Sequence, residues 1–175
     1  MIDRSNVKAV QTRYQDMLFK SVVPFWLNHA QDTQYGGIST CLDRAGNIYS
    51  PDKSVWMQGR TAWTFSRLCN QYGVQDEWLN MAKSCIDFLD QLCIDPADGR
   101  MYFTVTQDGR PLRKRRYFFS EAFYTIGHAE YALAAGDQQA LEQARYYYTF
   151  ICRLYDDPSS DPFKIWPKTL PETRR

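Results

Sequence analysis

The sequence lacks the residue patterns that mark several common classes of protein. Its five cysteines are an odd number, and no two of them have the Cys-x-x-Cys spacing of a zinc site. A net charge of +1 provides no basic surface for nucleic acid or an anionic membrane. No apolar run approaches the length of a membrane span, and residues 1–15 have no apolar signal core. We therefore expect a cytoplasmic protein with reduced thiols that binds neither nucleic acid nor membrane.

The overall composition is that of a globular protein of one domain. Hydrophobic residues make up 44% of the 175-residue chain and charged residues 23%. Aromatic residues are frequent at 15%, with 12 tyrosines among them. Tyrosine and tryptophan combine an apolar body with a polar edge, which suits a sugar cleft but also fills a hydrophobic core. Composition alone leaves both interpretations open.

Helical periodicity dominates the chain. Five segments predict helices from apolar residues at three- and four-residue spacing or from an apolar character throughout: 6–30, 54–71, 76–93, 118–135 and 138–155. Pro24 is expected to kink or restart the first helix. Glycine-punctuated alternating runs over 36–50 and 95–112 predict two β-hairpins. Residues 156–175 contain four prolines and predict no regular helix.

The predicted elements repeat along the chain. The interval from Gly36 to Gly46 recurs 63 residues later as the interval from Gly99 to Gly109. Each hairpin precedes one helix that is apolar over most of its circumference and one that is amphipathic. A period of this length is typical of a helical repeat array. We predict an all-α fold, an α/α toroid in which the helices over 54–71 and 118–135 form an inner layer covered by amphipathic outer helices.

Polar side chains at the start of the two inner helices are the candidates for chemistry. In a toroid these first turns point into the mouth of the ring, which places Lys53, Gln58, Arg60 and Glu121 there. An arginine offers fixed donors that can hold an oxyanion, and the helix dipole adds to this effect. The competing interpretation is a buried Arg60–Glu121 ion pair that joins the two inner helices. The two interpretations are compatible, because a carboxylate can orient a functional arginine.

The same residues resemble a known family. The stretch from Phe25 to Leu68, with Tyr35–Gly37, Lys53, Trp56 and the run "QGR" at residues 58–60, is similar to the N-terminal part of the N-acylglucosamine 2-epimerases, also described as renin-binding proteins. The run "FFSEAFYTIGHAEYA" resembles the second inner segment of that family. The resemblance covers the whole chain.

The resemblance implies an (α/α)6 barrel that interconverts N-acylglucosamine and N-acylmannosamine at C2 by proton transfer, without a metal or redox cofactor. In this scheme Arg60 stabilises the oxyanion and Glu121 orients Arg60 or a sugar hydroxyl. Trp56, Phe119, Gln58 and Lys53 are the further residues expected to bind the sugar. Adenine nucleotides affect some members, but the chain has no GxxxxGK[ST] loop.

The chain also departs from the family. The family's two catalytic histidines lie in the later part of a chain about twice as long, and neither His29 nor His128 matches them. We expect residues 1–175 to form a single incomplete domain of about five of twelve helices, inactive alone and associating through exposed inner faces or as a homo-oligomer. Three alternatives remain: an aldose–ketose isomerase on the same scaffold, a non-catalytic truncated paralogue, and a glycosidase. A glycosidase would pair Glu121 with Asp43 or Asp52 as facing carboxylates.

Overall fold

The computed structural model describes residues 4–114 and 118–157, which are mostly helical. The first helical segment comprises α1 (Arg4–Met17), the π-helical turn η1 (Leu18–Val22) and α2 (Val23–His29). The later helices are α3 (Val55–Tyr72), α4 (Asp76–Leu92), α5 (Phe119–Ala135) and α6 (Gln138–Asp156). These bounds confirm the five predicted helical segments. We predicted no regular helix over residues 156–175. Of these, residues 158–175 lie outside the described part of the chain.

Short strands lie between the helices where the glycine pattern predicts them. The first hairpin contains β1 (Cys41–Leu42) and β2 (Ile48–Ser50). The second contains β4 (Thr104–Val105) and β5 (Pro111–Arg113). An additional strand, β3 (Lys53–Ser54), pairs antiparallel with β4 and so joins the entrance of α3 to the second hairpin. The sequence did not predict this pairing, because it joins two residues of one repeat to the next repeat and no local sequence pattern marks it.

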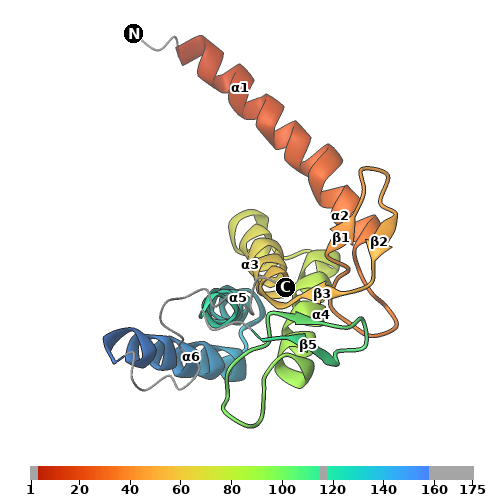
Figure 1. Cartoon of the computed structure of the whole chain (residues 1–175). Coiled ribbons are helices and arrows are strands. Elements are labelled where there is room, and N and C mark those ends of the chain that lie inside the picture. Colours follow the sequence, from red (N-terminus) through yellow and green to blue (C-terminus); the bar gives the residue numbers. More distant parts are fainter. Residues whose placement is uncertain (1–3, 115–117, 158–175) are drawn as a thin grey trace.

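The helices form two layers. The inner helices α3 and α5 pack along each other, α4 packs on the outer side of α3, and α6 packs on the outer side of α5 (Figure 1). Two groups of buried side chains fill the space between the layers. One is centred on Phe65, Met81 and Ile86, and the other on Phe88, Tyr124 and Tyr147. The predicted division into inner and outer helices is therefore confirmed.

The repeat extends to individual hydrogen bonds. In the first repeat the Asp32 amide donates to the carbonyl of Gly37, and 63 residues later the Asp95 amide donates to the carbonyl of Arg100. The amide of Ser39 donates to Ala30, and that of its counterpart Tyr102 donates to Cys93. The two hairpin loops therefore share one backbone design, even though most of their side chains differ.

Two glycines allow the inner helices to approach closely. A Cβ atom at Gly59 would lie 2.5 Å from the carbonyl oxygen of Phe123, and one at Gly127 would lie 2.7 Å from the carbonyl oxygen of Gly59. Real Cβ atoms do not come so close to backbone, so α3 and α5 can keep this separation only because both positions lack a side chain. Gly59 therefore sets the position of α5, and with it Phe123, relative to α3.

The first helical segment changes character along its length. Pro24 has no amide hydrogen to donate and crowds the preceding turn, and the π-helical turn η1 lies directly before it. Beyond this turn the chain packs onto the body through Val23 and Ala30. Residues 4–17 instead project away from the body as the free helix α1 (Figure 1). No helix in residues 4–114 and 118–157 is both long and apolar enough to cross a bilayer.

Candidate functional site

The inner helices expose one continuous stripe of side chains, which we call the open face. On α3 it carries Trp56, Arg60 and Trp63, spaced four and three residues apart. On α5 the exposed members are Phe119, Ile126 and Leu133. Trp63 has 38% of its surface exposed and Phe119 has 60%, although both belong to inner helices. The open face is where an inner layer meets solvent, and the sequence predicted that functional side chains lie on this layer.

Arg60 lies on the open face and is exposed. Its side chain lines a hollow of about 250 Å³ together with Trp26 of α2 and Met57, Thr61, Thr64 and Phe65 of α3. Within the described part of the chain the guanidinium has no hydrogen-bonding or ion-pair partner, so its donors are available to a ligand. The competing interpretation of a buried Arg60–Glu121 ion pair is wrong, because Arg60 is exposed and Glu121 pairs with Arg100. Helical periodicity identified the inner helix but did not show which side of that helix faces solvent.

A second pocket lies at the start of the inner helices, where Trp56 is one helical turn before Arg60. Among residues 4–114 and 118–157, Trp56, Phe103, Phe119 and Phe123 line this pocket, which has a volume of about 300 Å³. The rings of Trp56 and Phe123 lie 5.3 Å apart and tilted by 53°. Trp56 and Phe119 are separated by 63 residues and are therefore equivalent positions of the two repeats. Trp56 and Phe119, which the resemblance implies to bind the sugar, both line this pocket, whereas the sequence analysis missed Phe103 and Phe123.

Lys53 does not reach this site. Its side chain is completely buried, and its Nζ atom lies 2.7 Å from the carbonyl oxygen of Gly36 and 2.9 Å from Asp32 Oδ2. The ammonium group also lies 4.3 Å from the centre of the Phe88 ring. The predicted contact between Lys53 and a sugar is corrected accordingly. Lys53 fixes the loop before the first hairpin, because it neutralises Asp32 and holds the backbone at Gly36.

Gln58 and Glu121 are also buried supports of the hairpins. Gln58 accepts a hydrogen bond from the amide of Ile38 at 2.9 Å and donates one to its carbonyl oxygen at 2.8 Å. Glu121 accepts from the amide of Met101 at 3.0 Å and from Arg100 Nε at 2.8 Å. Neither side chain has exposed surface, so their predicted direct contact with a sugar is corrected. Gln58 and Glu121 lie 63 residues apart, a signal that could have shown that they share one structural role.

The carboxylates considered for a glycosidase do not face each other. Glu121 is buried against Arg100, while Asp43 is an exposed hairpin residue that accepts hydrogen bonds from Ala45 and Asn47. Asp52 is half-buried before β3. A buried, charge-neutralised carboxylate and two loop aspartates do not form the facing pair that glycoside hydrolysis requires.

The two histidines of the chain are occupied elsewhere. His29 is exposed at the end of α2, where its ring packs against the first hairpin at Gly46. His128 is completely buried, with Nε2 2.9 Å from Asp90 Oδ1 and Nδ1 3.0 Å from the carbonyl oxygen of Tyr124. The Tyr124 hydroxyl donates to the same Asp90 oxygen, and burial together with the Asp90 charge raises the pKa of Tyr124. This cluster joins α5 to α4 and faces away from the open face.

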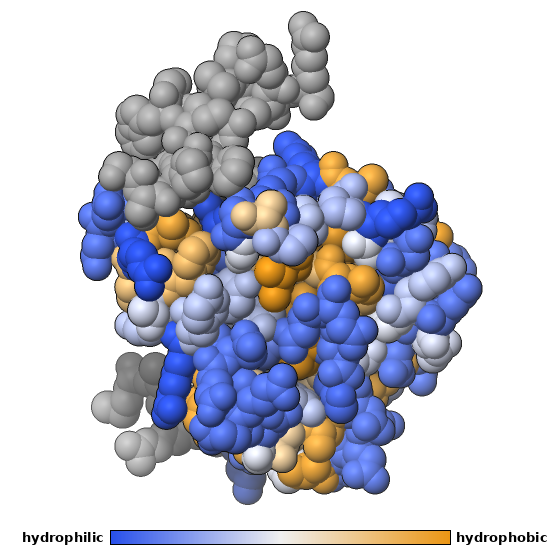
Figure 2. Space-filling view, turned by 90° about the horizontal axis from the view of Figure 1, so that it is seen from below, coloured by the Kyte–Doolittle hydropathy of each residue, from blue (hydrophilic) through white to orange (hydrophobic). Residues whose placement is uncertain are grey.

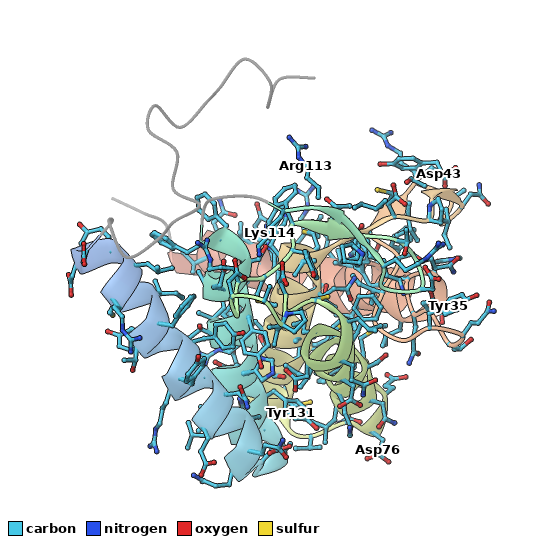
Figure 3. All side chains as sticks on the ribbon, turned by 60° about the horizontal axis from the view of Figure 1, so that its bottom comes forward. Tyr35, Asp43, Asp76, Arg113, Lys114 and Tyr131 are labelled. Carbon is cyan, nitrogen blue, oxygen red and sulfur yellow. The ribbon has the colours of Figure 1, made fainter. Side chains whose placement is uncertain are left out.

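Charged residues at the rim are paired as well. Lys114, which Figure 3 shows close to the first turn of α5, donates to Asp95 at 2.6 Å and to Asp98 at 2.7 Å. The hydrogen bond from Lys114 holds the pKa of Asp95 below its ordinary value. Among residues 4–114 and 118–157, no three His, Cys, Asp or Glu side chains gather in a way that could hold a metal ion. Arg60 and the aromatic pocket are thus the ligand-accessible features of this region that the sequence pointed to.

Comparison with known proteins identifies the context of this site. Residues 36–169 match the sequence profile of the N-acylglucosamine 2-epimerase (GlcNAc 2-epimerase) family. The N-acylglucosamine 2-epimerase of Bos taurus is 40% identical over 126 residues, which are 70% of this chain and 30% of that protein. The cellobiose 2-epimerase of Dictyoglomus turgidum is 29% identical over 147 residues, 83% of this chain and 37% of the relative. The chain spans about a third of the length of these curated relatives.

Solved structures agree with this match. The solved structure of the cellobiose 2-epimerase of Spirochaeta thermophila aligns with a TM-score of 0.76 at 25% identity, over 91% of this chain and 39% of that chain. The two-layered arc of α3, α4, α5 and α6 is therefore part of an (α/α)6 barrel, as predicted from the helix pattern and the family resemblance.

Proposed function

Because this chain belongs to the N-acylglucosamine 2-epimerase family, we propose that it supplies the oxyanion-binding part of a sugar 2-epimerase that interconverts N-acylglucosamine and N-acylmannosamine. The exposed Arg60, which has no partner in the described part of the chain, is the observation that carries this proposal. The bovine relative named N-acylglucosamine 2-epimerase is more similar in sequence than the cellobiose 2-epimerases, which favours the amino sugar as substrate.

The proposed reaction moves one proton. A base removes the C2 proton of the open-chain aldose, the electron pair of the broken C–H bond forms a C1–C2 double bond, and the C1 carbonyl oxygen becomes an enolate oxygen. An acid then returns a proton to the opposite face of C2, which restores the carbonyl and inverts the configuration. The substrate is neither oxidised nor reduced overall, so the proposed chemistry requires no redox cofactor.

Arg60 is suited to the charged intermediate of this reaction. Negative charge develops on the oxygen only after the proton leaves, and a positioned donor stabilises that state more than the neutral sugar. A guanidinium provides several donors in one plane and retains its charge at neutral pH. Thr61 and Thr64 add hydroxyl groups to the same hollow. The chain contributes an anion-stabilising group in this scheme, while His29 and His128 lie where neither can act as the base.

The cellular setting belongs to the same proposal. All five cysteines are free thiols, as is usual for proteins of a reducing compartment. We place the activity in the cytoplasm, with a free sugar as the small-molecule partner.

Exchange of the C2 proton with deuterated water tests the proposal, because it reports deprotonation even without net epimerisation. We expect the 175-residue chain alone to catalyse no exchange in N-acetylglucosamine. When the remaining part of the bovine relative is supplied in trans, exchange should appear, and Arg60→Ala should lower its rate by about 10²–10³-fold.

Arg67→Ala is the matched control, because Arg67 is an exposed arginine of the same helix that pairs with Glu130. It should leave the exchange rate within about twofold, since the pair is a surface ion pair. Exchange catalysed by the chain alone would assign the base to this chain and would overturn the division of roles proposed here. An unchanged rate in Arg60→Ala would remove Arg60 from the mechanism.

A further inference from the structure

A buried histidine joins two helices through both of its ring nitrogens. His128 of α5 has no exposed surface. Its Nε2 atom lies 2.9 Å from Oδ1 of Asp90 on α4, and its Nδ1 atom lies 3.0 Å from the carbonyl oxygen of Tyr124 on its own helix. The Tyr124 hydroxyl donates to the same Asp90 oxygen at 2.6 Å. We call Asp90, Tyr124 and His128 the Asp90 cluster.

The partners of the imidazole ring determine how many protons it carries. A carbonyl oxygen and a carboxylate oxygen can only accept hydrogen bonds, whereas a neutral imidazole has one N–H group and one lone pair. A neutral His128 beside an ionised Asp90 would therefore direct a lone pair at one of these two oxygens. Both contacts are hydrogen bonds when the ring is an imidazolium, which has two N–H groups.

Two further features favour a positive charge on this ring. The imidazolium and the Asp90 carboxylate form a pair without net charge, which is less costly to bury than a single charge. The Tyr124 ring stacks on the imidazole ring, with the centroids 3.7 Å apart and an angle of 23° between the planes. An aromatic face attracts a cation that lies over it. Burial and the Asp90 charge raise the pKa of Tyr124, so its hydroxyl keeps the proton that it donates.

The elements around the cluster leave Asp90 as the charged group in contact with the ring, within the described part of the chain. The other titratable side chains nearby are neutral or have partners of their own. Burial raises the pKa of three of them, which stay uncharged: Cys93 of α4, Tyr131 of α5 and Tyr147 of α6. The charged ones form pairs: Lys83 with Asp87 on α4, and Glu121 of α5 with Arg100. The helix α3 packs on another side of α5, against Gly127.

The turn of α5 that carries the cluster also contacts α3. A Cβ atom on Gly59 would lie 2.5 Å from the carbonyl oxygen of Phe123 and 3.0 Å from the amide nitrogen of Tyr124. Gly59 directly precedes Arg60. Asp90 and Gly59 therefore hold the same part of α5 from two sides, and a change at His128 acts on the backbone contact beside Arg60.

We propose that Asp90 and His128 form a proton-dependent clasp between α4 and α5, which is closed while His128 is an imidazolium and loosens when the ring loses a proton. The deprotonated ring can keep one of its two hydrogen bonds but not both. The helical turn over residues 124–128 then loses a tie to α4 or to its own backbone. The clasp contributes stability at low pH, and this contribution is lost as the pH rises through the titration of His128.

NMR of the ring nitrogens tests the clasp in the wild-type chain. The sequence contains two histidines, so labelling with ¹⁵N-histidine gives two ring systems, and His29→Gln assigns them. At about pH 7.5, roughly one unit above the ordinary histidine pKa, we expect two protonated ring nitrogens in His128 and one in the exposed His29. A single protonated nitrogen in His128 under these conditions would overturn the proposal.

Asp90→Asn tests the partner of the ring. The asparagine oxygen can still accept from Tyr124 but carries no charge, so His128 should show one protonated nitrogen at the same pH. Asp87→Asn is the matched control, because Asp87 belongs to the same helix and forms a surface pair with Lys83. It should leave His128 unchanged, and circular dichroism checks that both variants fold. A doubly protonated His128 in Asp90→Asn would remove Asp90 from the clasp.

Amide hydrogen exchange tests the loosening itself. After correction for the intrinsic effect of pH, exchange within residues 124–128 should become about tenfold faster or more once His128 loses its proton, which corresponds to one hydrogen bond to a charged group. The amide of Ala144, which is buried on α6, is the internal reference and should keep its rate. An unchanged rate within residues 124–128 would show that the ring holds its proton without closing a clasp, and the proposal would fail.

Discussion

Two side chains that hold the hairpins to the inner helices differ in charge, and their neighbours explain the difference. Gln58 uses its amide as donor and acceptor for the backbone of Ile38, next to Gly37. In the second repeat the position of Gly37 is taken by Arg100, and the position of Gln58 is taken by Glu121. A buried carboxylate is tolerated only when it is paired, and here Arg100 provides the pair. The inner helix therefore carries the charged Glu121 where the loop carries the charged Arg100, and the neutral Gln58 where the loop carries Gly37.

The role of Gln58 predicts a large loss of stability on substitution. Gln58→Ala leaves the amide and the carbonyl of Ile38 buried without partners, which we expect to lower the free energy of unfolding by about 2–4 kcal/mol. Gln71→Ala, at an exposed position near the end of the same helix, should change it by less than about 0.5 kcal/mol. Urea denaturation measures both values. A loss below about 0.5 kcal/mol for Gln58→Ala would show that water replaces the side chain.

The buried pair of Lys53 and Asp32 predicts how stability depends on pH. Burial alone would raise the pKa of Asp32, but hydrogen bonds from Lys53, the Tyr35 amide and Gln107 outweigh it and hold the pKa below the ordinary 3.8. The carboxylate therefore contributes stability that is complete above the unfolded pKa of 3.8 and is lost as the pH falls through the lower folded value.

The matching test is the acid unfolding of Lys53→Met. Without the ammonium group the pKa of Asp32 should rise, so the variant should unfold at a higher pH than the wild-type chain. Lys83→Met is the control, because Lys83 forms an exposed ion pair with Asp87 within α4. Identical acid midpoints for wild type and Lys53→Met, measured by circular dichroism, would contradict the assigned role of Lys53.

Residue roles at the site were harder to predict than residue positions. The family resemblance assigned Trp56 and Phe119 to sugar binding, which stays a prediction, and the helix pattern placed Arg60 on an inner helix, where the structure has it. The sequence could not show that Arg60 is exposed, because its neighbours Trp56 and Trp63 suggest burial while lying on the open face themselves. Arg100 was missed because it follows a hairpin glycine, and only the folded loop brings it to Glu121.

At the scale of elements, the contact between α3 and α5 depends on glycines in the middle of helices. Glycine in a helix costs about 1 kcal/mol relative to alanine, so its presence there needs a packing reason. Gly59 and Gly127 have that reason, because each touches the backbone of the opposite helix. Gly59 also separates Gln58, which holds a hairpin, from Arg60, which faces solvent. In the run "QGR", Gln58 therefore holds a hairpin, Gly59 allows the close contact with α5, and Arg60 faces solvent.

This contact predicts that a better helix former destabilises the protein. Gly59→Ala should lower the free energy of unfolding by about 1–3 kcal/mol through overpacking, despite the higher helix propensity of alanine. Gly136→Ala is the comparison, since Gly136 has a φ of +67° but open space around its Cβ position. Its cost should stay near 1 kcal/mol, from the left-handed backbone alone. Thermal denaturation that ranks Gly136→Ala as the more harmful change would refute the close helix contact.

Element types and order were predictable because the hydrophobic period and the glycine spacing are local signals. The pairing of β3 with β4 was not, because it joins residues that lie about 50 positions apart and has no local pattern. The π-helical turn was only partly predictable. Pro24 predicted an interruption of the first helix, but its form depends on how Val23 and Ala30 pack onto the body.

At the scale of the whole molecule, the described chain is an arc with apolar side chains left uncovered. The helix α1 carries Val7, Val10, Tyr14 and Met17, spaced three and four residues apart and each at least 45% exposed. This is the spacing of a helix-pairing seam. Further exposed apolar residues lie on the open face, and Figure 2 shows several separate hydrophobic patches on the end opposite α1.

We therefore predict that the chain associates with itself. Contiguous apolar patches of more than a few hundred Å² are rarely left open on soluble monomers. The seam on α1 is the most accessible of these surfaces, because the main contact of residues 4–17 with another described element is with the adjoining turn η1. Sedimentation velocity should show species larger than a monomer at micromolar concentration, and Val10→Lys combined with Tyr14→Lys should shift the distribution toward the monomer.

Gln11→Lys and Gln15→Lys add the same charge to exposed positions off the seam and should leave the distribution unchanged. A wild-type chain that sediments as a monomer would mean that the exposed side chains of α1 and the open face are tolerated in water, and the association would be refuted.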